Sequence, residues 1–221
     1  QASQPRLRAA YAQMLQTSAT GLPPGSPPNA DPLGRELQRQ TDRASNIVGN
    51  LLNFSRTGNA EEFGDIQINK LLNDTLQLLE PQLRKSSIEI VKDYAEDVPP
   101  ILGSGAKLQQ VFTNLILNAR DAMFEGGKIT LRTFSSSDDG VTIEVVDDGE
   151  GIPAANLKKV FDPFFTTKGV GNGTGLGLAV SYGIIQEHNG TIEVSSAEGE
   201  GTTFRLIFPT AQKADRKRAV S

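Results

Sequence analysis

Two glycine-rich clusters are the parts of this chain whose residue types and spacing best suit ligand binding. The first, residues 147–151 (DDGEG), starts with Asp147 and follows an alternating apolar run at 141–146. The second, residues 173–177 (GTGLG), leads straight into an apolar pattern with helical spacing. Glycines at this spacing let backbone amides turn toward an anion and let a ligand approach closely. Because a helix that begins just after such a cluster adds the positive end of its dipole, the pattern predicts an anion-binding site.

A pair of asparagines upstream could add a metal to this site. Asn114 and Asn118 are four residues apart, so their amides share one face of a predicted helix at 107–123. Amides in an otherwise apolar helix are costly unless they find partners. An amide oxygen suits Mg²⁺, which takes few protein ligands and completes its shell with phosphates and water. The alternative, two asparagines at an exposed helix surface, is disfavoured by the two glycine clusters.

Apolar spacing predicts the elements that position these residues. The predicted helices cover 69–85, 107–123 and 175–188, and the predicted strands lie at 66–68, 88–91, 128–134, 141–146, 191–195 and 203–208. Ser104 is placed to cap the helix at 107–123. Strands and helices that alternate in this way predict an α+β fold, with the strands in one mixed sheet.

The first 57 residues have a different character. Helical spacing at 1–18 and 32–56 flanks a proline- and glycine-rich loop at 21–32, which predicts a helical hairpin. Its narrow apolar stripe cannot be buried by the two helices alone, so we expect pairing with a second copy as a homodimer. Packing of the hairpin on the downstream domain is the alternative. The polar residues 58–64 form the predicted linker.

Composition excludes several classes of function. The 221 residues are 37% hydrophobic and 22% charged with a net charge of −4, typical of a soluble globular protein and unlike a broad nucleic-acid binder. The absence of cysteine excludes disulfides and thiolate metal sites, and it is compatible with the cytoplasmic location that we expect. No apolar run is long enough to span a bilayer, so we expect no membrane contact by this segment. His188 is the single histidine, and we expect it to have a structural role at a helix end.

Five motifs occur together and in order: LQQVFTNLILNARDAM, VVDDGEGIP, VFDPFFTTK, GTGLGLAV and GEGTTF. They resemble the N box, first glycine box, F box, second glycine box and final glycine motif of sensor histidine kinases. The segment NIVGNLLNFSR within 32–56 is similar to the second helix of that family's dimerisation hairpin. The resemblance implies a hairpin at 1–57, an ATP-binding catalytic domain at 65–210 and a tail at 211–221. It also implies that the catalytic domain is a two-layer α/β sandwich of the histidine kinase/Hsp90-like ATPase type.

The resemblance further implies a role for individual residues. Asp147 would accept a hydrogen bond from the adenine amine, supported by Thr202, and Asn118 would bind Mg²⁺ with help from Asn114. Lys168 would contact the phosphates from a lid at 162–173, so Asn114, Asn118 and Lys168 form the implied catalytic set. The other residues implied to bind ATP are Gly149, Gly151, Ile152, Phe161, Gly173, Thr174, Gly175, Leu176, Gly177 and Leu178. The lid would be anchored by Phe161, Phe164 and Phe165.

The chain departs from the family pattern at three points, and one of them is Ser104, where the family often has an acidic residue at the start of the N-box helix. Some members carry a basic residue three positions after the metal asparagine, where this chain has Asp121 beside Arg120. No histidine precedes Tyr11, so the family's phosphoacceptor motif is absent. We expect truncation just after that motif, and therefore no autophosphorylation by this chain alone.

The function implied by the resemblance is transfer of the ATP γ-phosphate to a histidine, followed by relay to a response-regulator receiver domain. A nucleotide-binding pseudokinase that docks a partner is the alternative from a different class. Another ATPase of the same superfamily is a further alternative. It is disfavoured because Gln110 and residues 113–117 offer no carboxylate to activate water.

Overall fold

The mixed order of strands and helices is confirmed by the computed structural model, which describes residues 63–136, 140–168 and 173–211. All of them belong to the unit Ile47–Ser221, the second of two into which the chain divides. The predicted hairpin at 1–57 lies outside the described residues, as do residues 212–221 of the predicted tail. The domain boundaries therefore stay a prediction.

The main sheet has five strands in the order β2-β4-β5-β7-β6. Its strands are β2 (Ile88–Tyr94), β4 (Gly127–Ser136), β5 (Gly140–Asp147), β6 (Thr191–Ser196) and β7 (Thr202–Pro209). The β2–β4 pair is parallel, and the other three pairs are antiparallel. The register sets Asp147, at the end of β5, opposite Thr202, at the start of β7.

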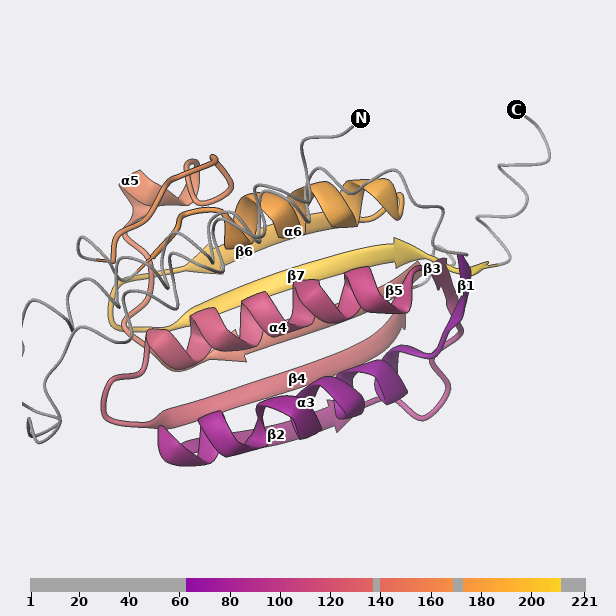
Figure 1. Ribbon diagram of the computed structural model, residues 1–221, viewed down its shortest axis with the longest axis horizontal. Helices are drawn as coiled ribbons and strands as arrows, with labels where there is room; N and C mark the ends of the chain where they lie inside the picture. The colour runs from indigo at the N-terminus through magenta and orange to yellow at the C-terminus, as the bar shows by residue number, and fades with distance from the viewer. Residues whose placement is uncertain (1–62, 137–139, 169–172, 212–221) are drawn as a thin grey trace, which may run out of the picture. The chain divides into compact units, whose positions relative to one another are not determined.

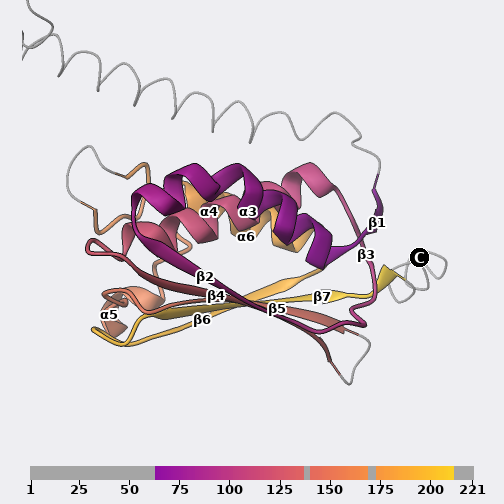
Figure 2. The ribbon, with the colours of Figure 1, turned by 90° about the horizontal axis from the view of Figure 1, so that it is seen from below.

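Three helices, α3 (Ile68–Lys85), α4 (Gly105–Asp121) and α6 (Gly177–Glu187), form a layer on one face of this sheet (Figures 1 and 2). Each was predicted from apolar spacing, and the observed bounds differ by at most two residues at either end. A fourth helix, α5 (Ala154–Leu157), was not predicted, because its four residues are too few to show a period. Within the described ranges, no helix has the length and apolar character needed to cross a bilayer.

Helix α4 is the central element of the core. Its buried residues recur every three or four positions and are Leu108, Val111, Phe112, Leu115, Ile116 and Ala119. They belong to one apolar cluster with sheet residues such as Ile129, Leu131 and Ile143. Complete burial of one such side chain stabilises a fold by about 1.5–3 kcal/mol. The polar residues on the rest of α4 are therefore carried by a firmly packed element.

The expectation of one sheet is wrong in one respect, because β1 (Gly64–Ile66) and β3 (Ile101–Gly103) form a separate two-stranded sheet. The link between β3 and the main sheet is a single bridge from Ile101 to Thr210, just past the end of β7. Along its full length, β3 pairs with β1 and not with a strand of the main sheet.

His188, the residue after α6, has the structural role predicted for it. Its Nε2 accepts a hydrogen bond from the Ser104 backbone N–H at 2.9 Å, and its Nδ1 donates to the Ile184 carbonyl at 2.7 Å. Its ring also stacks on Phe63, with centroids 4.8 Å apart. Burial holds the pKa of His188 below its ordinary value, which favours the neutral form that these bonds require. Ser104 caps α4 as predicted, accepting from the Lys107 N–H at 3.4 Å.

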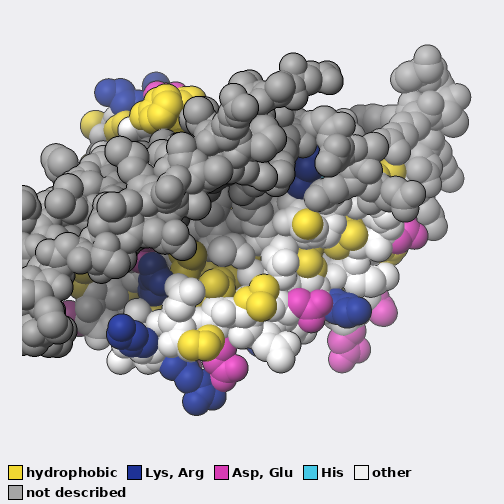
Figure 3. Space-filling model, in the orientation of Figure 1, with side chains coloured by type: hydrophobic (Ala, Val, Ile, Leu, Met, Phe, Trp, Pro, Cys, Tyr) yellow, Lys and Arg dark blue, Asp and Glu magenta, His cyan; other side chains and the backbone are white. Residues whose placement is uncertain are grey.

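The outer surface of the domain carries charges of both signs. Where described residues are visible in Figure 3, lysine and arginine side chains lie among aspartate and glutamate side chains, with scattered apolar residues. On α3, for example, Arg84 pairs with Glu80 at 2.7 Å, and both side chains are largely exposed. Such mixed charges produce no large field of one sign on this visible part of the surface.

Candidate functional site

A buried carboxylate stands at the end of the central strand β5. The Asp147 Oδ1 accepts hydrogen bonds from the backbone N–H groups of Gly149, at 3.0 Å, and Thr202, at 3.2 Å. No described residue donates a hydrogen bond to its second oxygen, Oδ2. Burial raises the pKa of Asp147 to about 6, against the effect of the two backbone hydrogen bonds, and the charge of Asp148 raises it further. Asp147 is therefore a fixed acceptor whose ionisation falls close to neutral pH.

The first glycine cluster is packed against two other segments. A Cβ on Gly149 would lie 2.7 Å from the Ala122 carbonyl oxygen, at the end of α4. Gly151 has φ of +72°, and a Cβ there would lie 2.0 Å from the Ala197 carbonyl oxygen, just after β6. The backbone N–H of Glu150 also donates to the Ala122 carbonyl at 3.0 Å. The loop after Asp147 is thus held between α4 and the β6–β7 turn.

Ser196, at the end of β6, joins three parts of this end of the site. Its Oγ accepts from the Ile152 N–H at 2.8 Å, donates to the Gly201 carbonyl at 2.7 Å and lies 3.1 Å from the Thr202 hydroxyl. Sequence reasoning did not find this residue. Its role follows from the register that sets Ser196 opposite Thr202, and no local pattern in the chain marks it.

Gly201 provides a sharp test of this packing. Its φ is +81°, and an added Cβ would lie 2.0 Å from the Asp147 carbonyl oxygen. Gly199 has a similar φ of +77°, but nothing lies within 4 Å of an added Cβ. We expect Gly199→Ala to cost about 1–2 kcal/mol of unfolding free energy from backbone strain alone. Gly201→Ala should cost about 1–3 kcal/mol more than Gly199→Ala, because the Asp147 carbonyl must move away from the added Cβ.

Chemical denaturation of the two alanine variants measures this difference directly. Equal losses of unfolding free energy would contradict the close packing of Gly201 on Asp147. Since Gly199 shares the backbone conformation but not the contact, it separates the two contributions.

The two asparagines of α4 have different surroundings. The Asn114 Nδ2 donates to the Gly177 carbonyl at 3.2 Å and to the Ser181 hydroxyl at 3.3 Å, so it ties α4 to the first turns of α6. The half-buried Asn118 side chain makes no hydrogen bond with another described residue. Its amide oxygen remains available to a ligand, which is the property that a magnesium ligand needs.

The second glycine cluster leads into α6, as predicted. No side chain caps the N-terminus of α6 at Leu176, so the amides of the first turn lack the partner that a capping residue supplies. Gly175 has φ of +65°, and its carbonyl accepts from the Phe164 N–H at 2.9 Å. A Cβ on Gly173 would lie 2.5 Å from the Thr166 hydroxyl oxygen. The cluster is therefore held against the F box, residues 160–168.

The other predicted ATP-binding residues of this segment pack locally. The Thr174 hydroxyl accepts from the Leu176 N–H at 3.4 Å, and Leu176 is buried. Leu178, Ile152 and Phe161 pack against the apolar core. The Phe161 ring lies 5.6 Å from that of Tyr182, measured between centroids. Phe161 therefore anchors the segment, whereas the prediction that Phe164 does so is wrong, since its side chain is 68% exposed and its φ is +68°.

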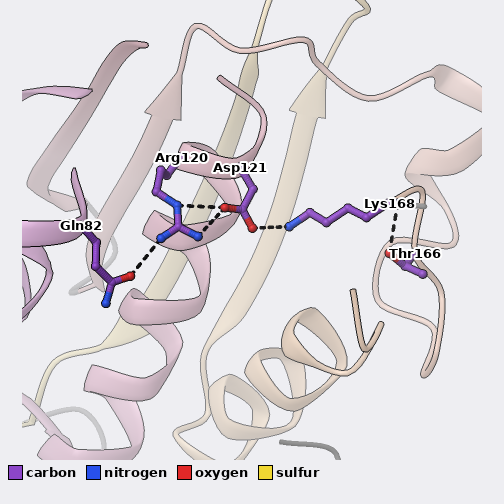
Figure 4. A network of polar contacts seen from close by, with 5 residues as sticks. All are labelled: Gln82, Arg120, Asp121, Thr166 and Lys168. Carbon is purple, nitrogen blue, oxygen red and sulfur yellow. Dashed lines mark hydrogen bonds and ion pairs between the residues drawn. The ribbon is translucent and has the colours of Figure 1, made fainter. Parts of the chain in front are cut away.

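Lys168 forms an ion pair that sequence reasoning missed. Its Nζ lies 2.7 Å from the Asp121 Oδ2, at the last residue of α4. Arg120 is directed to the other oxygen of Asp121 and to Gln82 of α3 (Figure 4). Arg120 therefore contacts the α3 side of the domain, and Lys168 is the cation that comes from the F box.

Both glycine clusters meet α4. The first contacts Ala122, just past the end of the helix, and the second is tied to Asn114 through Gly177. Asn118 lies between these two contacts in the sequence of the helix. A carboxylate acceptor near one contact and uncapped helix amides near the other suit a ligand with a hydrogen-bonding base and an anionic tail.

Comparison with known proteins gives a consistent result. A family model described as "Histidine kinase-, DNA gyrase B-, and HSP90-like ATPase" matches residues 103–212. The sensor kinase CckA of Brucella abortus is 42% identical over 190 residues, which cover 80% of this chain and 20% of that protein. The chain spans between 20% and 30% of the length of the first four curated relatives.

Solved structures agree with this match. The catalytic domain of histidine kinase ThkA, in a nucleotide-free form, is 32% identical with a TM-score of 0.61, covering 68% of this chain and 97% of that one. A longer ThkA structure has a TM-score of 0.68 at 24% identity, covering 95% of this chain and 62% of that one, which supports the fold.

Proposed function

This chain belongs to the sensor histidine kinases, within the histidine kinase-, DNA gyrase B-, and HSP90-like ATPases, and on this premise we propose that it binds Mg-ATP and transfers the γ-phosphate to a histidine. The observation that carries the proposal is the contact of both glycine clusters with α4, on either side of Asn118. This arrangement supplies separate groups for a base and for phosphates around one rigid helix.

Asp147 would recognise the base. Its Oδ1 is held by two backbone N–H groups, so its Oδ2 would accept from the exocyclic amine of adenine. Guanine presents a carbonyl oxygen at the equivalent edge, which a carboxylate repels. Because a hydrogen bond to a charged group is worth about 1.5–3 kcal/mol, the preference for adenine should be at least about tenfold.

Asn118, Lys168 and the start of α6 would hold the phosphates. The Asn118 amide oxygen, with no partner among the described residues, fits a magnesium ligand. Bound Mg²⁺ would supply neutralisation of phosphate charge. The uncapped amides after residues 173–177 would donate to phosphate oxygens, aided by the helix dipole. Asn114 would act by holding Gly177, and so the start of α6, against α4.

The acceptor and partners complete the proposal. The chain would work as a homodimer through the hairpin at 1–57, with its ATP-binding domain at 65–210 and the accepting histidine supplied from outside this sequence. The phosphate would then pass to a response-regulator receiver domain. Support comes from ThkA, whose catalytic domain is 32% identical to this chain and which has been solved in complex with a response regulator.

Transfer of label from γ-labelled ATP tests this function. The chain is mixed with a polypeptide in which residues 1–57 follow a histidine kinase acceptor helix, so that the two can form a mixed dimer. We expect acid-labile label on the histidine of the partner, and at least about tenfold less label at limiting ATP when the chain carries Asp147→Asn. Tight binding of Mg-ATP without any label on the partner would overturn the kinase assignment and favour a nucleotide-binding protein that signals by docking.

A further inference from the structure

Four side chains link α3, the end of α4 and the F box in one polar network (Figure 4). The Lys168 ammonium pairs with the Asp121 Oδ2 at 2.7 Å, and the Arg120 Nε donates to the Asp121 Oδ1 at 2.8 Å. The Arg120 Nη1 donates in turn to the Gln82 Oε1 at 2.9 Å. Each oxygen of the Asp121 carboxylate is therefore paired with a different cation. Arg120, which is itself bound to Gln82 of α3, fixes the orientation of the carboxylate.

The Asp121–Lys168 ion pair is partly buried, so the two side chains are held together more firmly than in an exposed pair. The exposed fractions of the two side chains are 30% and 34%, compared with 70% for the carboxylate of the surface pair Asp93–Arg132. Burial raises the pKa of Asp121, but hydrogen bonds and charges from Lys168 and Arg120 outweigh it and hold that pKa below its ordinary value. Asp121 is thus ionised at neutral pH, and its group with Arg120 and Lys168 carries a net positive charge.

The place of Asp121 on α4 brings Lys168 to the phosphate end of the site. Asp121 follows Asn118 by three residues, so the two side chains are neighbours on the helix surface. A lysine ammonium has three donors, and Asp121 uses one of them. The Lys168 backbone is also fixed, since its N–H donates to the Thr166 hydroxyl at 3.2 Å. Two donors of Lys168 are therefore left for an anion close to Asn118.

We propose that Asp121 is a positioning residue, which holds the Lys168 ammonium beside Asn118 so that it meets the terminal phosphate of ATP. The inference rests on the proposed function, because it needs a nucleotide at this site. A carboxylate on a helix that orients a phosphate-binding lysine is a known arrangement in other phosphotransferases. This role explains why the acidic Asp121 lies close to an anion-binding site, where its negative charge would otherwise only repel the phosphates.

Binding of Mg-ATP and Mg-ADP to the full chain, measured by calorimetry, tests the role of Asp121. Lys168→Met should weaken binding of Mg-ATP by about tenfold, the effect of one charged hydrogen bond. Asp121→Asn, which keeps the shape of the side chain, should weaken it by about threefold to tenfold, as loss of a sheltered ion pair would. Both variants should change binding of Mg-ADP less than about twofold, because ADP lacks the terminal phosphate.

The double variant provides the decisive comparison. If Asp121 acts through Lys168, adding Asp121→Asn to Lys168→Met should cause no further loss of affinity for Mg-ATP. Additive losses, unchanged affinity or tighter binding by Asp121→Asn would overturn the proposal. Tighter binding would mean that Asp121 competes with the phosphates for the lysine.

Controls separate this inference from general damage and from the proposed function. Asp93→Asn removes a carboxylate from an exposed pair and should leave both affinities unchanged. Melting temperatures show whether each variant folds, and Asp121→Ser replaces the asparagine variant if that one does not. Failure of the parent chain to bind Mg-ATP would count against the proposed function, whereas normal parent binding with an unaffected Asp121→Asn variant would count against this inference alone.

Discussion

Replacement of Asp147 by asparagine should weaken binding of Mg-ATP by about 10-fold to 100-fold, the value of one hydrogen bond to a charged group. The variant keeps the size of the side chain, and its amide oxygen can still accept from Gly149 and Thr202. Its NH₂ group would then take the place of Oδ2 and face the adenine amine, so that two donors meet. Calorimetric titration with Mg-ATP measures the loss, and Asp93→Asn is the control, because it makes the same change at an exposed carboxylate of β2.

The same residue should make ATP binding depend on pH. The pKa of Asp147 is about 6 without a ligand, and the ionised carboxylate is the form that accepts from adenine most strongly. Its contribution to affinity is therefore complete above that value and is lost as the pH falls through it. We expect the affinity of the parent to drop between pH 7 and 5 by more than that of Asp147→Asn. Identical pH profiles, or an asparagine variant that binds as tightly as the parent, would remove Asp147 from the base site.

Replacement of Asn118 by alanine should lower the affinity for ATP in the presence of Mg²⁺ by at least about 10-fold, since changes beside a metal typically cost 10-fold to 100-fold. Without Mg²⁺, in a chelator, the variant and the parent should bind ATP equally. The reason is that the Asn118 amide has no partner among the described residues, so its removal leaves the protein's own contacts intact. Titration of Mg²⁺ at fixed ATP concentration gives the shift directly.

Asn114→Ala is an informative contrast to Asn118→Ala. It removes the hydrogen bonds to Gly177 and Ser181, so we expect a lower melting temperature and weaker ATP binding with or without Mg²⁺. Asn73→Ala, at an exposed position of α3, should change neither property. If Asn118→Ala lost affinity equally in the chelator, Asn118 would be a structural residue, and the metal would have to be held elsewhere.

Local patterns predicted the parts of the site that depend on short spacing. The i, i+4 pair on α4, the two glycine clusters and the start of α6 all follow from the order of residues within a few turns of chain. The helices were predicted for the same reason, because the apolar faces of α3 and α4 repeat every three or four residues. Ser104 was recognisable as a cap, because it lies just ahead of such a pattern.

Features that depend on distant segments were not predictable in this way. The role of Ser196 requires the register of β6 on β7, and the Asp121–Lys168 pair joins residues 47 positions apart. The separate β1–β3 sheet depends on which partner each short strand finds, a choice that its few residues do not encode. The exposure of Phe164 could not be read from an aromatic cluster, since apolar type alone does not decide which ring reaches the core.

The sequence separations of the bonds around the site have a consequence for how the domain acquires its structure. Thr202 meets Asp147 over 55 residues, Gly177 meets Asn114 over 63, and His188 meets Ser104 over 84. Closing such loops costs chain entropy, so we expect these bonds to form after the local helices and turns. A nucleotide would find no binding surface on a half-folded chain. It would instead bind the completed domain and raise its free energy of unfolding by mass action.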